Sequence, residues 1–92
     1  MKNKLGKNET YLKGEWILQN DKVVGNEACE RIEYLISKIL KEVAVGNWTV
    51  LYRDEDDGRY WELFYEHSEW HGGGPPSLKQ VSEAEAKERY KI

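Results

Sequence analysis

Two segments that alternate apolar and polar residues, joined by a short acidic turn, constrain the fold of this chain more than any other feature. Trp48, Val50 and Tyr52 alternate with their neighbours, and residues 59–66 alternate in the same way. A period of two residues is typical of a β-strand whose faces lie in different environments. Asp57-Gly58 supplies residues that tolerate positive φ in the intervening turn. The pattern therefore predicts an antiparallel hairpin.

A helical pattern follows Asn26, which is a favourable N-cap. Apolar residues recur after it every three or four positions and form one stripe: Ala28, Ile32, Leu35, Ile36, Ile39, Leu40 and Val43. This spacing predicts a long helix that packs on a sheet and ends near Gly46. Its polar face carries charges of both signs, which argues against a membrane helix.

The N-terminal part of the chain alternates as well. Leu12, Trp16 and Leu18 would form the inner face of one strand, and Gly14 would leave room for a neighbouring large ring. Residues 20–24 contain a turn signal and a short return strand.

The C-terminal part supplies a loop, a strand and a helix. Residues 72–76 read Gly-Gly-Gly-Pro-Pro, which cannot continue a helix or pair within a sheet. Residues 77–81 could form a last short strand. Ser82 and Glu85 form a capping box, which predicts a helix over residues 83–90.

The chain of 92 residues is long enough for one domain with a single core. These elements predict the α+β class with two layers. An antiparallel sheet of four or five strands would pack against one long helix, with a short C-terminal helix. Residues 1–9 have almost nothing to bury and are expected to fray.

Composition excludes several classes of protein. Cys29 is the only cysteine, so an intrachain disulfide and zinc sites with several thiolates are excluded, and the cytoplasm is the expected compartment. The start of the chain lacks the apolar stretch of a signal peptide, and no segment is apolar enough to span a bilayer. A pI of 5.4 argues against binding nucleic acid through bulk charge.

Charge is unevenly distributed along the chain. Residues 54–69 carry seven acidic side chains and one basic side chain, a net charge of −6, whereas the whole chain carries −3. A local negative field attracts basic partners, and aromatic side chains beside it would supply anchoring contacts. The predicted contact residues are Asp54, Glu55, Asp56, Asp57, Tyr60, Glu62, Phe64, Glu66, Glu69 and Trp70.

Patterns for metal sites and catalysis are incomplete. Counted from Asp54, the fifth and twelfth positions of a calcium loop would be Gly58 and Tyr65, which do not fit. A zinc-protease helix needs Glu directly after the first His. In His67-Ser68-Glu69-Trp70-His71 the Glu comes one place later, and glycines follow at once.

Two functional alternatives nevertheless stay open. His67, Glu69 and His71 could serve a small metal-dependent hydrolase, and an exposed strand edge could make the chain a homodimeric adaptor module. Cys29 lies on or beside the apolar stripe, so a buried, inert thiol is expected. Oligomeric state is not evident from the residues.

Several short motifs, in this order and spacing, resemble the immunity protein 27 family of bacterial polymorphic toxin systems. They are Leu12-x-Gly14-x-Trp16, Trp48 with Leu51-Tyr52-Arg53-Asp54, Asp57-Gly58-Arg59-Tyr60-Trp61-Glu62, and Gly72-Gly73-Gly74-Pro75-Pro76-x-Leu78. The resemblance runs from about Thr10 to Tyr90. Glu55 stands where the family turn often has Pro, which makes this turn more acidic.

The resemblance implies a small α+β protein, encoded beside a toxin, that binds the toxin domain in the cytoplasm and blocks it. It implies no enzymatic activity and no cofactor, and its partner would be a protein rather than nucleic acid or a membrane. The acidic segment fits this expectation if the toxin is basic.

Overall fold

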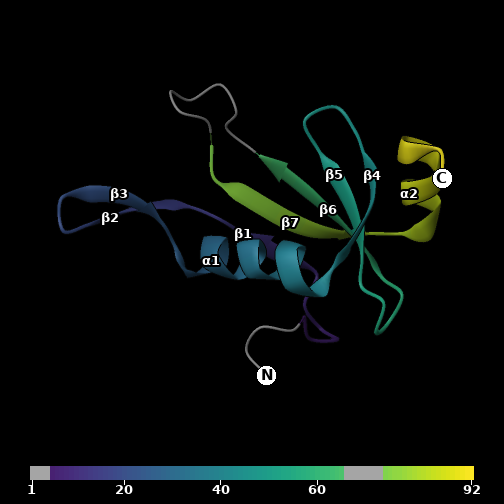
Figure 1. The fold of residues 1–92 in the computed structure, drawn as a ribbon, viewed down its shortest axis with the longest axis horizontal. Helices are drawn as coiled ribbons and strands as arrows, with labels where there is room; N and C mark the ends of the chain where they lie inside the picture. Colours follow the sequence, from purple (N-terminus) through teal and green to yellow (C-terminus); the bar gives the residue numbers. More distant parts are fainter. Residues whose placement is uncertain (1–4, 66–73) are drawn as a thin grey trace.

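The structure, a computed structural model, describes residues 5–65 and 74–92 (Figure 1). In chain order, the described residues form β1 (Tyr11–Lys13), β2 (Trp16–Gln19), β3 (Lys22–Gly25), α1 (Glu27–Tyr34), the π-helical turn η1 (Leu35–Ile39), β4 (Lys41–Val45), β5 (Val50–Arg53), β6 (Tyr60–Tyr65), β7 (Pro76–Val81) and α2 (Glu83–Tyr90).

Five of these strands form one antiparallel sheet in the order β1-β7-β6-β5-β4. Its central strand is β6, where Trp61 lies opposite Tyr52 of β5 and Gln80 of β7. The predicted hairpin of β5 and β6 is confirmed, and so are the α+β class and the antiparallel sheet. Strands β2 and β3 form a separate two-stranded ribbon that projects from the body of the molecule (Figure 1).

Helix α1 begins as its N-cap predicts. The side chain of Asn26 accepts a hydrogen bond from the backbone N–H of Cys29 at 3.0 Å, which satisfies one of the free donors of the first turn. The eight residues of α1 continue into the five of η1, where the helix stops. The backbone N–H of Leu40 donates to the carbonyl of Leu35 at 2.7 Å, and Leu40 itself is extended.

The prediction of one long helix ending near Gly46 is wrong. Residues 41–45 instead form β4 and pair with β5, and Gly46 lies in the hairpin between these strands. Val43 fits both a helical stripe and a strand, but β-branched residues prefer strands, and its neighbours Glu42 and Ala44 pair with Tyr52 and Leu51 of β5 across a register shift at Val43. Pairing with a distant strand therefore overrides the local spacing.

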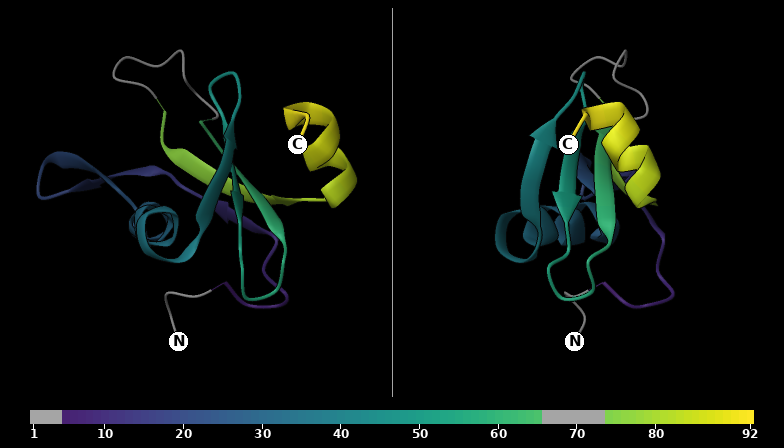
Figure 2. Two further views of the ribbon diagram at one scale, coloured as in Figure 1. Left: turned by 45° about the vertical axis from the view of Figure 1, so that its right-hand side comes forward. Right: turned by 90° about the vertical axis from the view of Figure 1, so that its right-hand side faces the viewer.

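The two helices lie on opposite faces of the sheet (Figure 2). The main core, under α1 and η1, consists of Leu5, Leu12, Ile32, Leu35, Leu40, Tyr52, Trp61, Leu63 and Leu78. A smaller core under α2 consists of Leu51, Val81 and Ala86. Successive strand residues point to opposite faces, so Leu51 and Tyr52 belong to different cores. Helix α2 thus adds a partial third layer that the expected two-layer arrangement lacks.

The predicted N-terminal strand is divided into two at Gly14. Leu12 is buried as expected, but the chain then leaves the main sheet, and Trp16 and Leu18 are 41% and 72% exposed. A Cβ atom on Gly14 would lie 2.0 Å from the carbonyl oxygen of Pro76. This glycine therefore permits close backbone contact at the end of the β1–β7 ladder rather than space for a ring.

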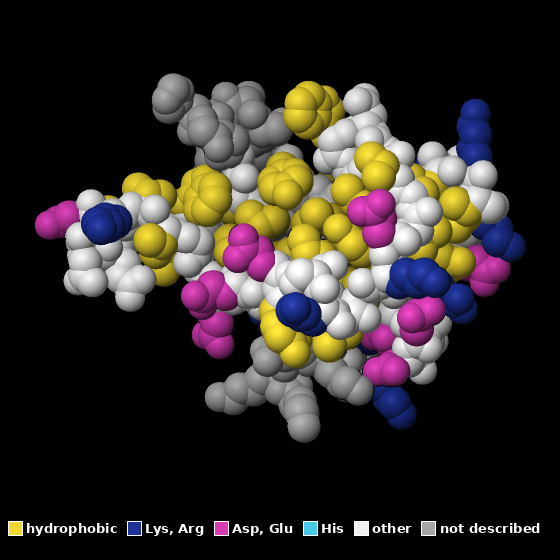
Figure 3. Space-filling view, in the orientation of Figure 1, with side chains coloured by type: hydrophobic (Ala, Val, Ile, Leu, Met, Phe, Trp, Pro, Cys, Tyr) yellow, Lys and Arg dark blue, Asp and Glu magenta, His cyan; other side chains and the backbone are white. Residues whose placement is uncertain are grey.

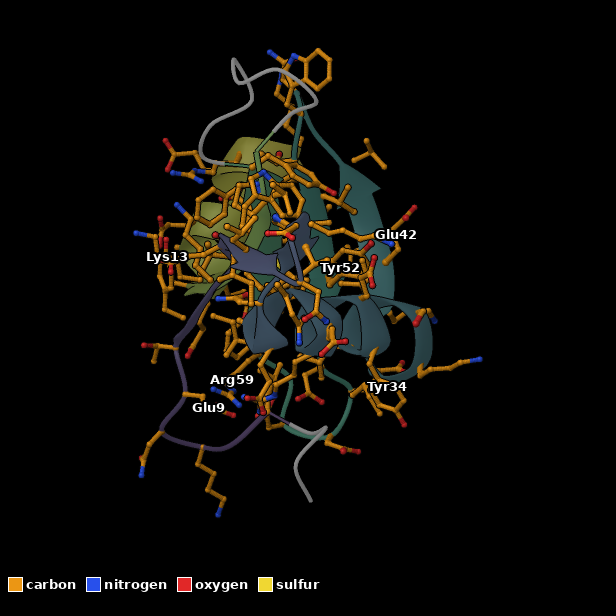
Figure 4. The ribbon with its side chains drawn as sticks, turned by 90° about the vertical axis from the view of Figure 1, so that its left-hand side faces the viewer. Glu9, Lys13, Tyr34, Glu42, Tyr52 and Arg59 are labelled. Carbon is orange, nitrogen blue, oxygen red and sulfur yellow. The ribbon has the colours of Figure 1, made fainter. Side chains whose placement is uncertain are left out.

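The described part of the segment before β1 is packed, contrary to the expected fraying. Leu5 joins the main core, and the guanidinium of Arg31 holds the carboxylate of Glu9 through two hydrogen bonds of 2.5 and 2.6 Å. Arg59 donates to the backbone carbonyls of Gly6 and Glu9 at 2.9 and 2.7 Å. Figure 4 shows Arg59 and Glu9 next to each other. Two arginines from distant elements thus fix this segment.

Substitution of Gly14 by Ala should lower the free energy of unfolding by about 2 kcal/mol or more, because the added methyl group would overlap a backbone oxygen. Gly6→Ala is the matched control, since its Cβ would meet only the flexible side chain of Glu9 at 3.5 Å. This control should stay within about 0.5 kcal/mol of wild type. Urea denaturation measures both, and equal stabilities for the two variants would contradict the assignment.

Substitution of Glu9 by Gln should lower stability at neutral pH by about 1 kcal/mol, a modest value because the ion pair is partly exposed to solvent. The hydrogen bonds from Arg31 lower the pKa of Glu9 from 4.5 to about 2. A carboxylate whose pKa falls on folding stabilises above its unfolded pKa and loses that contribution as pH falls through its folded pKa. The difference between wild type and variant should therefore be constant above about pH 4.5 and shrink toward pH 2. A difference that does not change with pH would point to packing instead.

Candidate functional site

The acidic turn between β5 and β6 is organised around Asp54, which is buried. Its side chain accepts a hydrogen bond from the backbone N–H of Asp56 at 2.9 Å, and its carbonyl accepts one from Gly58 at 2.7 Å. Gly58 has a φ of +79°, as a turn glycine permits. Asp54, which the sequence predicts as a contact residue, therefore holds the turn in shape from a buried position.

Cations from the fold partly neutralise the other acids of this turn. The carboxylate of Asp57 accepts two hydrogen bonds from Arg59, one from its guanidinium at 2.6 Å and one from its backbone N–H at 3.0 Å. Burial would raise the pKa of Asp57, but these bonds outweigh it and lower the pKa. Glu55 lies 4.0 Å from Lys41, and both side chains are largely exposed. Glu55 and Asp56 are the acids of the turn most open to a partner.

Glu62, which the sequence predicts as a contact residue, is buried on the α2 side of the sheet. Its carboxylate accepts hydrogen bonds from Arg89 at 2.8 Å and from the hydroxyl of Tyr90 at 2.7 Å, and Lys79 lies 3.5 Å away. Burial raises the pKa of Glu62, but Tyr90 and Arg89 lower it by more, and the result is a pKa below the ordinary value. The group is an internal tie between β6 and α2.

The aromatic residues Tyr60 and Phe64 are half-buried on the same face. The guanidinium of Arg53 lies 5.9 Å from the ring of Tyr60, which packs beside the smaller core. Phe64 meets Tyr11 edge to face at 6.2 Å, and the ammonium of Lys79 lies 5.1 Å from its ring. Phe64 shares its strand face with glutamate, and its aromatic and cationic neighbours explain why an aromatic side chain is favourable there.

Several predicted residues lie outside the described ranges, namely Glu66, His67, Glu69, Trp70 and His71. Their roles, as contact residues or as metal ligands, stay predictions. Among residues 5–65 and 74–92, no three His, Cys, Asp or Glu side chains are placed to hold a metal ion. Within the same ranges, no helix has the length and apolarity needed to cross a membrane.

Cys29 is buried, as predicted. Its Sγ lies 3.7 Å from the carbonyl oxygen of Glu15, and a Cβ atom on Gly14 or Gly25 would approach it closely. The thiol therefore fills the junction between the ribbon and α1.

Exposed apolar side chains mark surfaces that the sequence patterns missed. Leu18 and Val23 on the ribbon are 72% and 69% exposed, Val45 on β4 is 68% exposed, and Trp48 is 82% exposed. Figure 3 shows hydrophobic side chains in a band from the ribbon across the sheet toward the β4–β5 hairpin. Alternation of apolar and polar residues predicts that one face of a strand is covered by an apolar surface. The sequence pattern is identical whether that surface is the protein's own core or another protein.

Trp48 also has an unfavourable backbone conformation. Its φ is +65°, a region that costs a non-glycine residue roughly 1–2 kcal/mol. Trp48 follows Asn47 in a tight hairpin closed by a 2.8 Å hydrogen bond from the N–H of Gly46 to the carbonyl of Thr49. Glycine is the usual residue where such a turn needs a positive φ, so this tryptophan is held in a strained, exposed position.

Substitution of Tyr90 by Phe should destabilise the protein by about 1–2 kcal/mol, because it removes the hydroxyl that donates to buried Glu62 and lies 2.6 Å from the hydroxyl of Thr49. Tyr34→Phe, at an exposed tyrosine of α1, should leave stability unchanged. Urea denaturation of both variants tests this prediction. A Tyr90→Phe variant as stable as wild type would show that Glu62 does not need this hydrogen bond.

The sequence profile of immunity protein 27 matches residues 18–82. The matched segment runs from within β2 to Ser82, the N-cap of α2, and includes the acidic turn and β4 to β7. Comparisons with curated proteins and with solved structures give no match. Because the profile covers more than two thirds of the 92 residues, the chain belongs to the immunity protein 27 family.

Proposed function

We propose that this chain binds a cognate toxin domain in the cytoplasm and neutralises it by forming a stoichiometric complex. The observation that carries the proposal is the family match over residues 18–82. Immunity proteins are generally not enzymes, and their partner is a protein. Inhibition then requires a surface complementary to the toxin rather than a pocket for a substrate.

The proposed contact surface is the outer end of the β5–β6 hairpin. Glu55, Asp56 and Asp57 are its exposed acids, whereas Asp54 and Glu62 support it from inside. The hairpin joins two inner strands of the sheet, and hydrogen bonds to Asp54 and Asp57 hold its turn in shape. A preorganised surface loses less conformational entropy on binding.

Half-exposed aromatic residues on β6 would add anchoring contacts to this surface. Tyr60 is the first residue of β6 after the turn, and Phe64 lies further along the same strand. Both side chains are on the face of the sheet opposite α1. Glu66, Glu69 and Trp70 follow the other end of β6 in the sequence and lie outside the described ranges, so their role as contact residues stays a prediction. Aromatic anchors with acids at the rim suit a basic protein groove.

The charge of the hairpin end favours a basic toxin. Glu55 and Asp56 face solvent, and the pair of Glu55 with Lys41 is long and exposed, so a partner's cations can replace it at little cost. Exposed charges act over about 8 Å at physiological salt. Their expected contribution is mainly to the rate of association.

Charge reversal at the hairpin end tests this surface. The variant Glu55→Lys/Asp56→Lys should reduce the association rate constant for the toxin domain encoded beside this chain by about tenfold and weaken its salt dependence. Asp57 is left unchanged because its pair with Arg59 belongs to the fold. Surface plasmon resonance at several salt concentrations measures the effect.

Glu88→Lys, at an exposed acid on α2, is the control for a charge reversal away from the hairpin and should associate at the wild-type rate. If the double variant also associates at the wild-type rate, the hairpin end is not part of the contact. If wild-type protein neither binds this toxin domain nor suppresses its activity, the proposed function is wrong.

A further inference from the structure

The β2–β3 ribbon presents an apolar face that the described part of the chain leaves uncovered. Leu18 pairs with Val23 and Trp16 with Gly25, so these side chains share one face of the ribbon. Leu18 and Val23 keep about 70% of their surface exposed. In Figure 1 the ribbon extends to the left of the sheet, and its tip is remote from both helices.

The ribbon is well formed although little of its own protein supports it. Its base is held by a 2.9 Å hydrogen bond from the N–H of Asn26 to the carbonyl of Glu15. At its tip Asn20 and Asp21 both have positive φ, as a tight two-residue hairpin turn requires. An isolated two-stranded hairpin is marginal in water, so a partner that covers its apolar face would stabilise it.

Trp48, in the hairpin between β4 and β5, is a second exposed apolar feature. Its ring is 82% exposed and its backbone adopts a conformation that glycine would adopt without strain. The exposed ring contributes little to the free energy of folding, and the positive φ of Trp48 makes that free energy less favourable. Tryptophan is among the residues that most often dominate the binding energy of protein interfaces.

Exposed sheet surface connects these two features. Val45 lies opposite Val50, which packs on the main core, so Val45 belongs to the α1 side of the sheet. Tyr65 is on the same side as Trp61 and is 44% exposed. In Figure 3 hydrophobic side chains continue across this region. We call this surface the apolar face: Leu18, Val23, Val45, Trp48 and Tyr65.

Acidic side chains border the apolar face. Glu27, Glu30 and Glu33 are exposed on α1, and Glu42 is exposed on β4. Figure 3 shows Asp and Glu side chains along the edge of the hydrophobic band. Two copies of the chain joined through this face would bring the same acids together, which disfavours self-association. A basic protein with an apolar patch would be complementary.

We propose that the apolar face is a second docking surface for the toxin domain, with Trp48 and the ribbon as its anchors. This inference rests on the proposed function and extends it. A standard interface buries roughly 800 Å² on each partner, more than three carboxylates at a hairpin end supply. The acidic turn and Trp48 lie at opposite ends of β5, so mutations can separate the two contacts.

The experiment measures binding of the toxin domain encoded beside this chain to purified variants by isothermal titration calorimetry. Trp48→Gly and Leu18→Ser should each raise Kd at least about tenfold. The melting temperature should be unchanged or higher for Trp48→Gly, because glycine relieves the strain at φ +65°. Trp48→Phe keeps an aromatic anchor and should bind within about threefold of wild type. Ile92→Ser, which changes a 45% exposed apolar residue beyond α2, should bind like wild type.

Each outcome decides between defined alternatives. If wild type binds and both Trp48→Gly and Leu18→Ser bind equally well, the apolar face is not a docking surface, and the proposed function stands. If the wild-type protein does not bind the toxin domain, the proposed function is wrong, and the toxin domain is not the partner that covers the apolar face. A dimer of wild type in sedimentation that Leu18→Ser abolishes would assign the face to a second copy and overturn the proposal.

Discussion

The central strand β6 imposes the constraint on which the rest of this structure depends. Both of its faces are inside the protein, but they differ in chemistry: Trp61 and Leu63 are apolar, whereas Glu62 is ionised between them. Helix α1 and η1 cover the face of β6 that carries Trp61 and Leu63. The other face needs donors for a buried carboxylate, and α2 supplies them from Arg89 and Tyr90. A buried charge without such partners would be strongly destabilising, so Glu62 ties α2 to this face in addition to the packing of Ala86 on Leu51 and Val81.

Arg59 has a comparable role at the end of the same strand. Its guanidinium lies 4.9 Å from the ring of buried Trp61 and donates to Asp57 and to the carbonyls of Gly6 and Glu9. The cation therefore joins the core, the acidic turn and the N-terminal segment. It also reduces the negative charge that the turn presents to solvent. Lys41, Lys79 and Arg89 lie outside residues 54–69 and pair with Glu55 and Glu62, so the field around this hairpin is weaker than the net charge of residues 54–69 indicates.

The exposed apolar side chains are not explained by the stability of the protein's own core. Leu18 and Trp48 contribute little to the protein's own core, and the backbone of Trp48 is strained. Natural proteins retain such features where a site needs them, at the expense of stability. In an immunity protein the requirement would be a partner's surface, which supplies the burial that the isolated chain lacks.

Features that depend on neighbouring residues were predictable from the amino-acid order. The turn at Asp57-Gly58, the N-cap at Asn26 and the capping box of Ser82 and Glu85 each involve residues within a few positions of one another. The hairpin of β5 and β6 and the helix α2 follow from these signals together with period-two alternation. Family membership was also predictable, because its motifs are short local strings in a definite order.

Features that depend on contacts between distant segments became apparent only in the folded chain. The helix ends at Leu40 because β5 provides partners for β4, and Leu18 is exposed because the backbone at Gly14 meets Pro76 and leaves the sheet. Glu62 can be buried because α2 brings Arg89 and Tyr90 to it from the far end of the chain. Periodicity specifies which side chains share a face, but only the packed chain determines whether that face meets the core, a buried ion pair or solvent, since this depends on which distant segment lies against it.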